Sequence, residues 1–148
     1  MKKSRIFLLL AIAVTIFIFT SSMQTAEVSS NASGRLLTLI NKLLSGTSVT
    51  LTQHTIRKFA HFAEFLAQAF FLSLAAVFSV RGMKKHLINI AFAGLLTACT
   101  DEYIQTFFGG RGAQVKDIFI DFSGTVTAII LTFLLTIIIR GIKDVRLR

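Results

Sequence analysis

Four long apolar runs, separated by short polar segments, dominate the hydrophobic pattern of the chain. They cover residues 6–20, 59–80, 87–108 and 118–139, and the first gives a helix of about 6–22 if the serines after it are included. About 20 consecutive apolar residues in a helix cross the hydrocarbon core of a bilayer, so the last three runs have spanning length. The pattern therefore predicts three transmembrane helices, and a fourth if the shorter first run is retained.

The first run can be interpreted in two ways. It follows a basic start at residues 1–5 (MKKSR) and is followed by small residues at 20–22 (TSS). This arrangement is typical of a cleaved secretory signal. Inclusion of residues 21–23 lengthens the run enough for a thin or locally compressed bilayer, which favours a retained anchor. The residues alone leave both interpretations open.

The longest polar stretch lies between the first two runs. Residues 21–33 are rich in Ser, Thr, Asn and Gln, which predicts an exposed loop on the outer face. Residues 34–44 then place leucine and isoleucine at helical spacing, with Arg35, Thr38 and Lys42 at other positions. This segment is too short to span a bilayer. It is either an amphipathic helix in the outer interface or a helix packed against the spans.

Composition narrows the class of protein. The 148 residues are 53% hydrophobic and 16% charged, with a mean hydropathy of +0.72. So much apolar surface cannot be buried in one small core, which excludes a disordered chain and most soluble domains. The single cysteine, Cys99, excludes a disulfide or a cysteine-based zinc site within one chain. We therefore expect an all-α integral membrane protein with one domain over residues 1–148, four transmembrane helices and a short outer interfacial helix.

The net charge of +9 comes from basic residues placed between the apolar runs. They form no patch with interleaved aromatic residues, so we expect no nucleic-acid partner. Cytoplasmic loops carry an excess of Lys and Arg, and segments 1–5, 81–86 and 140–148 hold ten of the 16 in the chain. This bias predicts a multi-pass protein of the cell membrane with both termini in the cytoplasm. The ten residues are Lys2, Lys3, Arg5, Arg81, Lys84, Lys85, Arg140, Lys143, Arg146 and Arg148.

Acidic residues are scarce, and most lie where membrane helices rarely carry them. Five of the seven fall inside or at the edge of an apolar run, namely Glu64, Asp101, Glu102, Asp117 and Asp121. One carboxylate at the centre of a membrane helix costs roughly 2.5 to 3.5 kcal/mol on insertion scales. A helical rise of about 1.5 Å per residue places all five at a similar depth in the outer leaflet. We therefore predict that they are paired or line one polar site.

Helical phase gathers polar groups into one stripe on each of the three later spans. Residues three, four or seven apart lie on the same face of a helix. The last stripe ends at a glycine, which permits close approach of a neighbouring helix. The stripes are Arg57, His61 and Glu64, then Asp101 and Gln105, then Asp117, Asp121 and Gly124.

A glycine-rich loop joins the third and fourth runs. Gly109, Gly110 and Gly112 permit a tight turn with positive φ. Such a turn could place Arg111 over the carboxylates or over a bound anion. An ordinary turn with an incidental arginine is the alternative.

Three ordered motifs carry a resemblance to a known family. Residues 57–65 (RKFAHFAEF) resemble the R-K-x-x-H-x-x-E-[YF] signature of the VanZ-like membrane proteins, and residues 101–107 (DEYIQTF) are similar to the family's D-E-x-x-Q-x-F. Residues 110–124 resemble a third segment in which a Gly-Arg pair is followed by Asp and Gly. The serine-rich residues 20–33 also fit the family's segment after its first span.

The chain departs from the family pattern at three positions. Gly109 stands where proline is common, which predicts a looser loop. Asp121 stands where asparagine is common and adds a charge, and Ala128 replaces an expected second glycine. None of these departures removes a signature residue.

The resemblance implies a four-helix protein of the bacterial cytoplasmic membrane that retains its first helix. It also implies a connection to low-level resistance to teicoplanin, a lipid-tailed glycopeptide, without remodelling of the peptidoglycan precursor. The expected partner is a membrane lipid, a lipid-linked cell-wall precursor or a lipoglycopeptide. The oligomeric state stays open.

Three functions are compatible with the polar stripes. In the first, the protein binds an amphiphilic anionic ligand. In the second, it is a membrane-embedded enzyme that acts on a lipid-linked cell-envelope substrate. In the third, it is a structural or partner-binding protein held together by ion pairs. The candidate ligand-binding residues are Arg57, Lys58, Gln105, Arg111, Asp117 and Asp121. The candidate catalytic acid and base residues are His61, Glu64, Asp101 and Glu102.

A metal site is a further alternative. His61 and Glu64 lie three residues apart, so they could supply two ligands, with Asp101 or Asp117 as a third. Two potential ligands at helical spacing are common by chance. We therefore assign no metal ligand and expect no cofactor.

Overall fold

The fold consists of helices, in a computed structural model that describes residues 2–43, 51–110 and 112–146. No strand occurs among these residues, so the expected all-α class is confirmed. The elements are α1 (Lys2–Ser22), α2 (Ala26–Leu43), α3 (Gln53–Val77), the short 3-10 helix η1 (Met83–His86), α4 (Leu87–Gln105) and α5 (Val115–Arg146).

Four helical segments of the described chain are long and apolar enough to cross a membrane. They are Lys2–Ser22, Gln53–Val77, Met83–Gln105 and Val115–Ile142. The predicted number of spans is therefore confirmed, including the short first one. The protein is a multi-pass membrane protein.

The helices do not begin and end where the apolar runs do. α3 begins six residues before the expected residue 59, because the Thr52 side chain caps it by accepting the backbone N–H of Thr55 at 3.2 Å. It ends at Val77, before a turn in which the N–H of Gly82 donates to the Ser79 hydroxyl at 3.2 Å. α5 extends beyond its apolar run at both ends, since the chain has no proline to stop it. Apolar runs thus mark the membrane part of a helix, and polar turns extend it.

The segment after α1 differs from the prediction. Residues 21–33 were expected as a loop, but α2 begins at Ala26 and makes most of them helical. The Thr25 carbonyl accepts the N–H of Ser29 at 3.1 Å, and the Ser33 hydroxyl donates to the Ser29 carbonyl at 2.8 Å. Serine in a helix can satisfy its hydroxyl on the preceding turn, so a polar composition alone did not exclude a helix.

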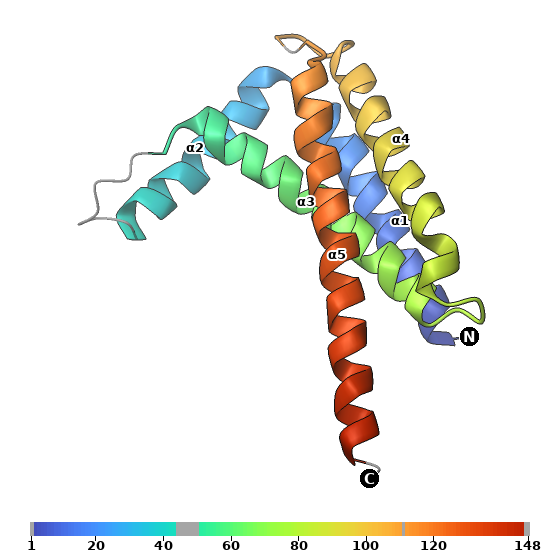
Figure 1. The fold of residues 1–148 in the computed structure, drawn as a ribbon. Coiled ribbons are helices and arrows are strands. Elements are labelled where there is room, and N and C mark those ends of the chain that lie inside the picture. The colour runs from blue at the N-terminus through green and yellow to red at the C-terminus, as the bar shows by residue number, and fades with distance from the viewer. Residues whose placement is uncertain (1, 44–50, 111, 147–148) are drawn as a thin grey trace.

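α3 is the central helix of the bundle and packs against α1, α2, α4 and α5. In Figure 1, α1, α4 and α5 run side by side with α3 inclined across them, whereas α2 lies along the first part of α3 and points away from the other spans. The start of α1 and the end of α5 lie at the same end, and the loop between α4 and α5 lies at the opposite end. The first and last described helices therefore have their outer ends at the same end of the bundle.

The backbones of α3 and α5 approach each other closely at Gly124. A Cβ added there would collide with the backbone carbonyl oxygen of Phe62 and lie 3.1 Å from the backbone nitrogen of Leu66. The predicted close approach at this glycine is confirmed. Ala128, one turn further along, is fully buried in the same interface, so the small alanine still fits where the family pattern has a second glycine.

Polar and small side chains share the interior with a few large apolar ones such as Phe65, whereas many large apolar side chains cover the outside. Gln68 is 2% exposed and donates to the hydroxyls of Thr15 at 2.7 Å and Thr97 at 3.1 Å, so it links α3 to α1 and α4. By contrast, Leu9 and Phe92 are more than half exposed. This inverted distribution is expected when the surrounding solvent is lipid.

The side of the membrane on which the termini lie is a prediction. In a Cys99→Ser background, we expect Val80→Cys to be protected from a membrane-impermeant thiol reagent in intact cells and Gly109→Cys to be labelled, because the basic bias places the termini inside. Val80 is 94% exposed and Gly109 has open space around it, so both cysteines are reachable. Labelling of the cysteine at position 80 without labelling of the one at position 109 would show that the termini lie outside the cell.

The α3–α5 contact yields a second prediction. We expect Gly124→Ala to lower the stability of the detergent-solubilised protein by about 1 to 3 kcal/mol, because the methyl group forces two backbones apart. Gly141→Ala is the matched control, since that glycine is in the same helix and no heavy atom approaches its Cβ position. Thermal unfolding followed by circular dichroism measures both. Equal midpoints for the two variants would contradict a close contact at Gly124.

Candidate functional site

The centre of the site is a histidine that faces a buried aspartate across two helices. His61 on α3 places its Nδ1 3.8 Å from Oδ2 of Asp101 on α4, and the Asp101 side chain is fully buried. The same Asp101 oxygen accepts a hydrogen bond from Nε2 of Gln105 at 2.7 Å, and its other oxygen accepts one from the hydroxyl of Ser22 on α1. Asp101 is therefore held in one orientation by three helices.

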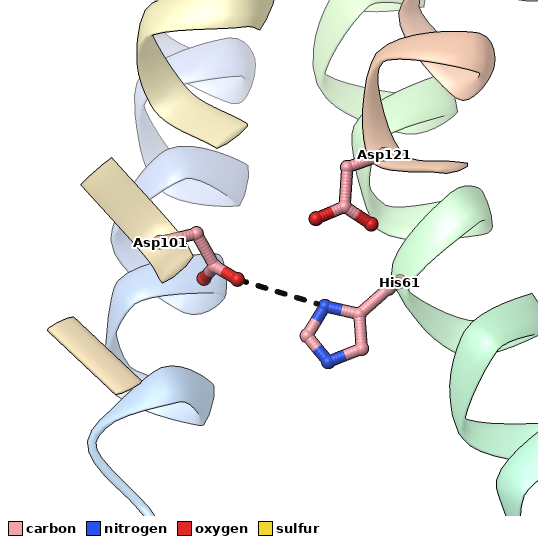
Figure 2. A group of neighbouring side chains, drawn as sticks. All are labelled: His61, Asp101 and Asp121. Carbon is pink, nitrogen blue, oxygen red and sulfur yellow. Dashed lines mark ion pairs between the residues drawn. The ribbon is translucent and has the colours of Figure 1, made fainter. Parts of the chain in front are cut away.

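Asp121 brings α5 to the same point. Its side chain is 1% exposed and points toward His61 and Asp101 (Figure 2). One ligand atom from each of the three residues can be chosen so that all lie within 4.8 Å of one another. No hydrogen bond to the Asp121 Oδ2 is found among the described residues. A buried carboxylate oxygen normally has such a partner, so this oxygen is unusual.

Glu102 has a different role from its neighbour. It is 3% exposed, and its Oε2 accepts the backbone N–H of Gln114 at 2.7 Å. Nε2 of Gln105 lies 3.4 Å from its other oxygen. Glu102 thus ties the end of α4 to the residue just before α5. This contact fixes the loop over the site.

An ion pair joins the first turns of α3 and α5 at one side of the site. Nζ of Lys58 lies 2.9 Å from Oδ1 of Asp117, with about a quarter of each side chain exposed. Lys58 comes from the first turns of α3 and Asp117 from the first turn of α5. The pair therefore sits above the point where these helices come into contact. Its partial exposure leaves it within reach of a ligand.

These groups surround one cavity of about 80 Å³, named here the polar cavity. It contains seven of the ten predicted site residues, together with glycines of the α4–α5 loop. Its lining residues are Arg57, Lys58, His61, Glu102, Gln105, Gly110, Gly112, Gln114, Asp117, Ile120 and Asp121. The predicted convergence of three polar stripes is thus found in the structure.

The other two predicted site residues that the structure describes, Asp101 and Glu64, do not line the polar cavity. Asp101 lies behind the lining, against His61. Glu64 lines a neighbouring groove of about 270 Å³ between α2 and α3, which Arg57 and His61 also line. Arg111 is outside the described residues. The positive φ expected in its loop occurs at Gly110, where φ is +79°.

Two contributors to the site were not predicted. Ser22 was assigned only to a serine-rich segment, and Gln114 contributes through its backbone, which no side-chain pattern reveals. A buried serine at the end of an otherwise apolar helix is a weak signal. The carboxylate that it contacts is 79 positions away. Only the packing of α1 against α4 identifies the pair.

The fold and the site define a class of protein, a helical multi-pass membrane protein with a charged site between its spans. The family model described as VanZ/LLP1 matches residues 7–137. The chain therefore belongs to the VanZ/LLP1 family, as its motifs indicated. Neither the curated proteins nor the solved structures contain a match.

Ser22 yields a prediction about the site. We expect Ser22→Ala to lower the thermal stability of the solubilised protein by about 1 to 3 kcal/mol, because a buried carboxylate oxygen loses its donor. Ser21→Ala is the matched control, because Ser21 directly precedes Ser22 and is less buried. It should change stability by less than about 0.5 kcal/mol. If both serines are equally dispensable, the hydroxyl of Ser22 does not support Asp101.

Proposed function

We propose that this VanZ/LLP1 protein binds an amphiphilic anionic ligand in the polar cavity, from the outer leaflet, and thereby contributes to resistance to lipid-tailed glycopeptides of the teicoplanin type. One observation carries the proposal. α3, α4 and α5 bring a histidine and charges of both signs to one cavity at the end of the bundle opposite the termini. Charges at membrane depth usually mark a functional site.

The shape of the site suits a molecule with a charged head and an apolar tail. Arg57 and Lys58 line the polar cavity and would contact the anionic head. The adjoining groove, to which α1 also contributes, adds apolar lining from Phe17, Leu36 and Ile56. Because Arg57 and His61 belong to both linings, the cavity and the groove are adjacent. A head group and a tail could therefore bind side by side.

Binding of this kind offers a route to resistance. A lipid tail keeps a glycopeptide in the outer leaflet, close to the lipid-linked wall precursor that it attacks. A protein that binds either molecule by its anionic group would alter the access of one to the other. No change in the precursor itself is needed.

A second candidate function rests on the histidine. His61 faces Asp101 at 3.8 Å, and a carboxylate that orients an imidazole and stabilises its charged form is a recurrent acid–base arrangement. The protein would then be an enzyme acting on a lipid-linked cell-envelope substrate. Chromatography of lipid extracts from cells that express wild-type protein or His61→Gln would reveal a product. An identical lipid profile in both would count against catalysis.

The binding proposal predicts the effect of removing the cavity's lysine. In lipid nanodiscs, we expect Lys58→Gln to bind a fluorescent lipid-tailed glycopeptide or wall precursor at least about tenfold more weakly, which corresponds to about 1.4 kcal/mol. Lys84→Gln is the matched control, because Lys84 is exposed at the other end of the bundle. In cells, the Lys58 variant should remain abundant in the membrane and lose protection. Unchanged protection would contradict the proposal.

A double variant separates binding from structure. If the Lys58–Asp117 ion pair only holds helices together, Lys58→Gln alone leaves a carboxylate without its counter-ion and lowers abundance. Adding Asp117→Asn should then restore both abundance and protection. If the lysine binds a ligand, the double variant stays inactive although it is abundant.

A further inference from the structure

The polar cavity contains more carboxylates than cations. All five acids of the predicted stripes lie close enough to interact electrostatically, with Asp121 at the centre. Among the described lining residues, Arg57 and Lys58 are the lysines and arginines, and Lys58 already pairs with Asp117. Three carboxylates line the cavity, and two more, on Asp101 and Glu64, lie beside the lining, so the acids of this region outnumber these two cations. An anionic head group would therefore be repelled unless another cation is present.

Three side chains are arranged to hold such a cation. His61, Asp101 and Asp121 come from α3, α4 and α5, and their ligand atoms lie within 4.8 Å of one another. Figure 2 shows both carboxylates and the imidazole facing a common space. Asp121 is 1% exposed, and its Oδ2 has no hydrogen-bond partner among the described residues. A buried oxygen aimed at two other ligand atoms is what a metal ion would satisfy.

The surroundings of these side chains also fit a metal site. Zinc ligands lie about 2.0 to 2.2 Å from the ion, so three atoms within 4.8 Å of one another would each need to move inward by at most about 0.7 Å. Asp101 is oriented by Gln105 and by Ser22, as outer-shell hydrogen bonds orient the ligands of known metal sites. One nitrogen and two carboxylate oxygens suit Zn²⁺ or Mn²⁺ better than Mg²⁺ or Ca²⁺, which prefer oxygen alone.

We propose that His61, Asp101 and Asp121 bind one divalent transition-metal ion, Zn²⁺ or Mn²⁺, at the base of the polar cavity. The set differs from the one considered from the sequence, because Asp121 replaces Glu64. Three protein ligands leave coordination positions open, and an anionic oxygen of the ligand would occupy one of them. The proposal deepens the proposed function and rests on it for that last step, whereas metal binding itself does not depend on the ligand.

The test measures metal alone on the full-length protein. Protein carrying a histidine-free tag is purified in detergent with chelator, dialysed against Zn²⁺ or Mn²⁺, and analysed by mass spectrometry of the metal and by titration calorimetry. We expect one equivalent bound to the wild type. Loss of a direct ligand in Asp121→Asn should weaken binding by about 100-fold or more, since even outer-shell changes cost 10- to 100-fold.

Asp117→Asn is the matched control. It removes the same charge from the same helix, four residues away, but from the carboxylate that pairs with Lys58. We expect it to weaken metal binding by less than about tenfold, because it acts only through the electrostatic field. Equal weakening in both variants would show diffuse attraction by acidic residues and would overturn the site.

A measurement on the wild type covers the case in which Asp121→Asn does not fold. Pulsed electron paramagnetic resonance of bound Mn²⁺ should show one directly coordinated nitrogen, which remains when His54 and His86 are both replaced by Gln. Absence of nitrogen coupling, or of stoichiometric metal, overturns the proposal. Metal binding without binding of glycopeptide or wall precursor leaves the metal site standing and instead contradicts the proposed function.

Discussion

The close contact between α3 and α5 at Gly124 determines the geometry of the rest of the protein. α3 crosses all the other spans, so the point at which it meets α5 sets the position of both. The backbone of Phe62 lies against Gly124. His61 directly precedes Phe62, and Asp121 lies about one helical turn before Gly124. Backbone contact leaves little freedom for the neighbouring side chains. The two groups therefore face each other at the crossing and not at some other level.

Two polar systems of different character lie along the bundle. Around Gln68, neutral hydroxyl and amide groups join α1, α3 and α4 by hydrogen bonds and carry no net charge. Nearer the α4–α5 loop, the groups are ionisable and a cavity separates them. The Gln68 amide nitrogen has two acceptors, although its Oε1 has no hydrogen-bond partner among the described residues. The second system also includes such an atom, the Oδ2 of Asp121, but this atom belongs to a carboxylate that faces a histidine and a second carboxylate. This difference in charge is why function is assigned to the charged end of the bundle.

Much of the fold and part of the site follow from sequence periodicity, because helical phase is a local property. The number of spans, the polar stripes and the role of Gly124 could be read directly. Contacts between distant helices could not. Ser22 meets Asp101 across 79 positions, and Glu64 turns toward the groove although its stripe points to the same region. The loop predicted from the composition of residues 21–33 was also wrong. Most of this serine-rich segment is helical in α2, where the Ser33 hydroxyl donates to a carbonyl of the preceding turn. Helical periodicity predicts which face of a helix a residue lies on, but only the packing of the helices determines which side chain it contacts.

The hydrogen bond between Ser22 and Asp101 bears on how the chain is made. Spans enter the membrane in order of synthesis, so α1 and α3 precede α4, and α4 precedes α5. When α4 brings Asp101 into the bilayer, the Ser22 hydroxyl and the His61 imidazole that contact this carboxylate are already in the membrane. α4 can therefore leave the translocation machinery without exposing a bare carboxylate to lipid. Removal of α1 would therefore take the earliest of these partners away, and α4 would enter the bilayer with one donor fewer for its buried carboxylate.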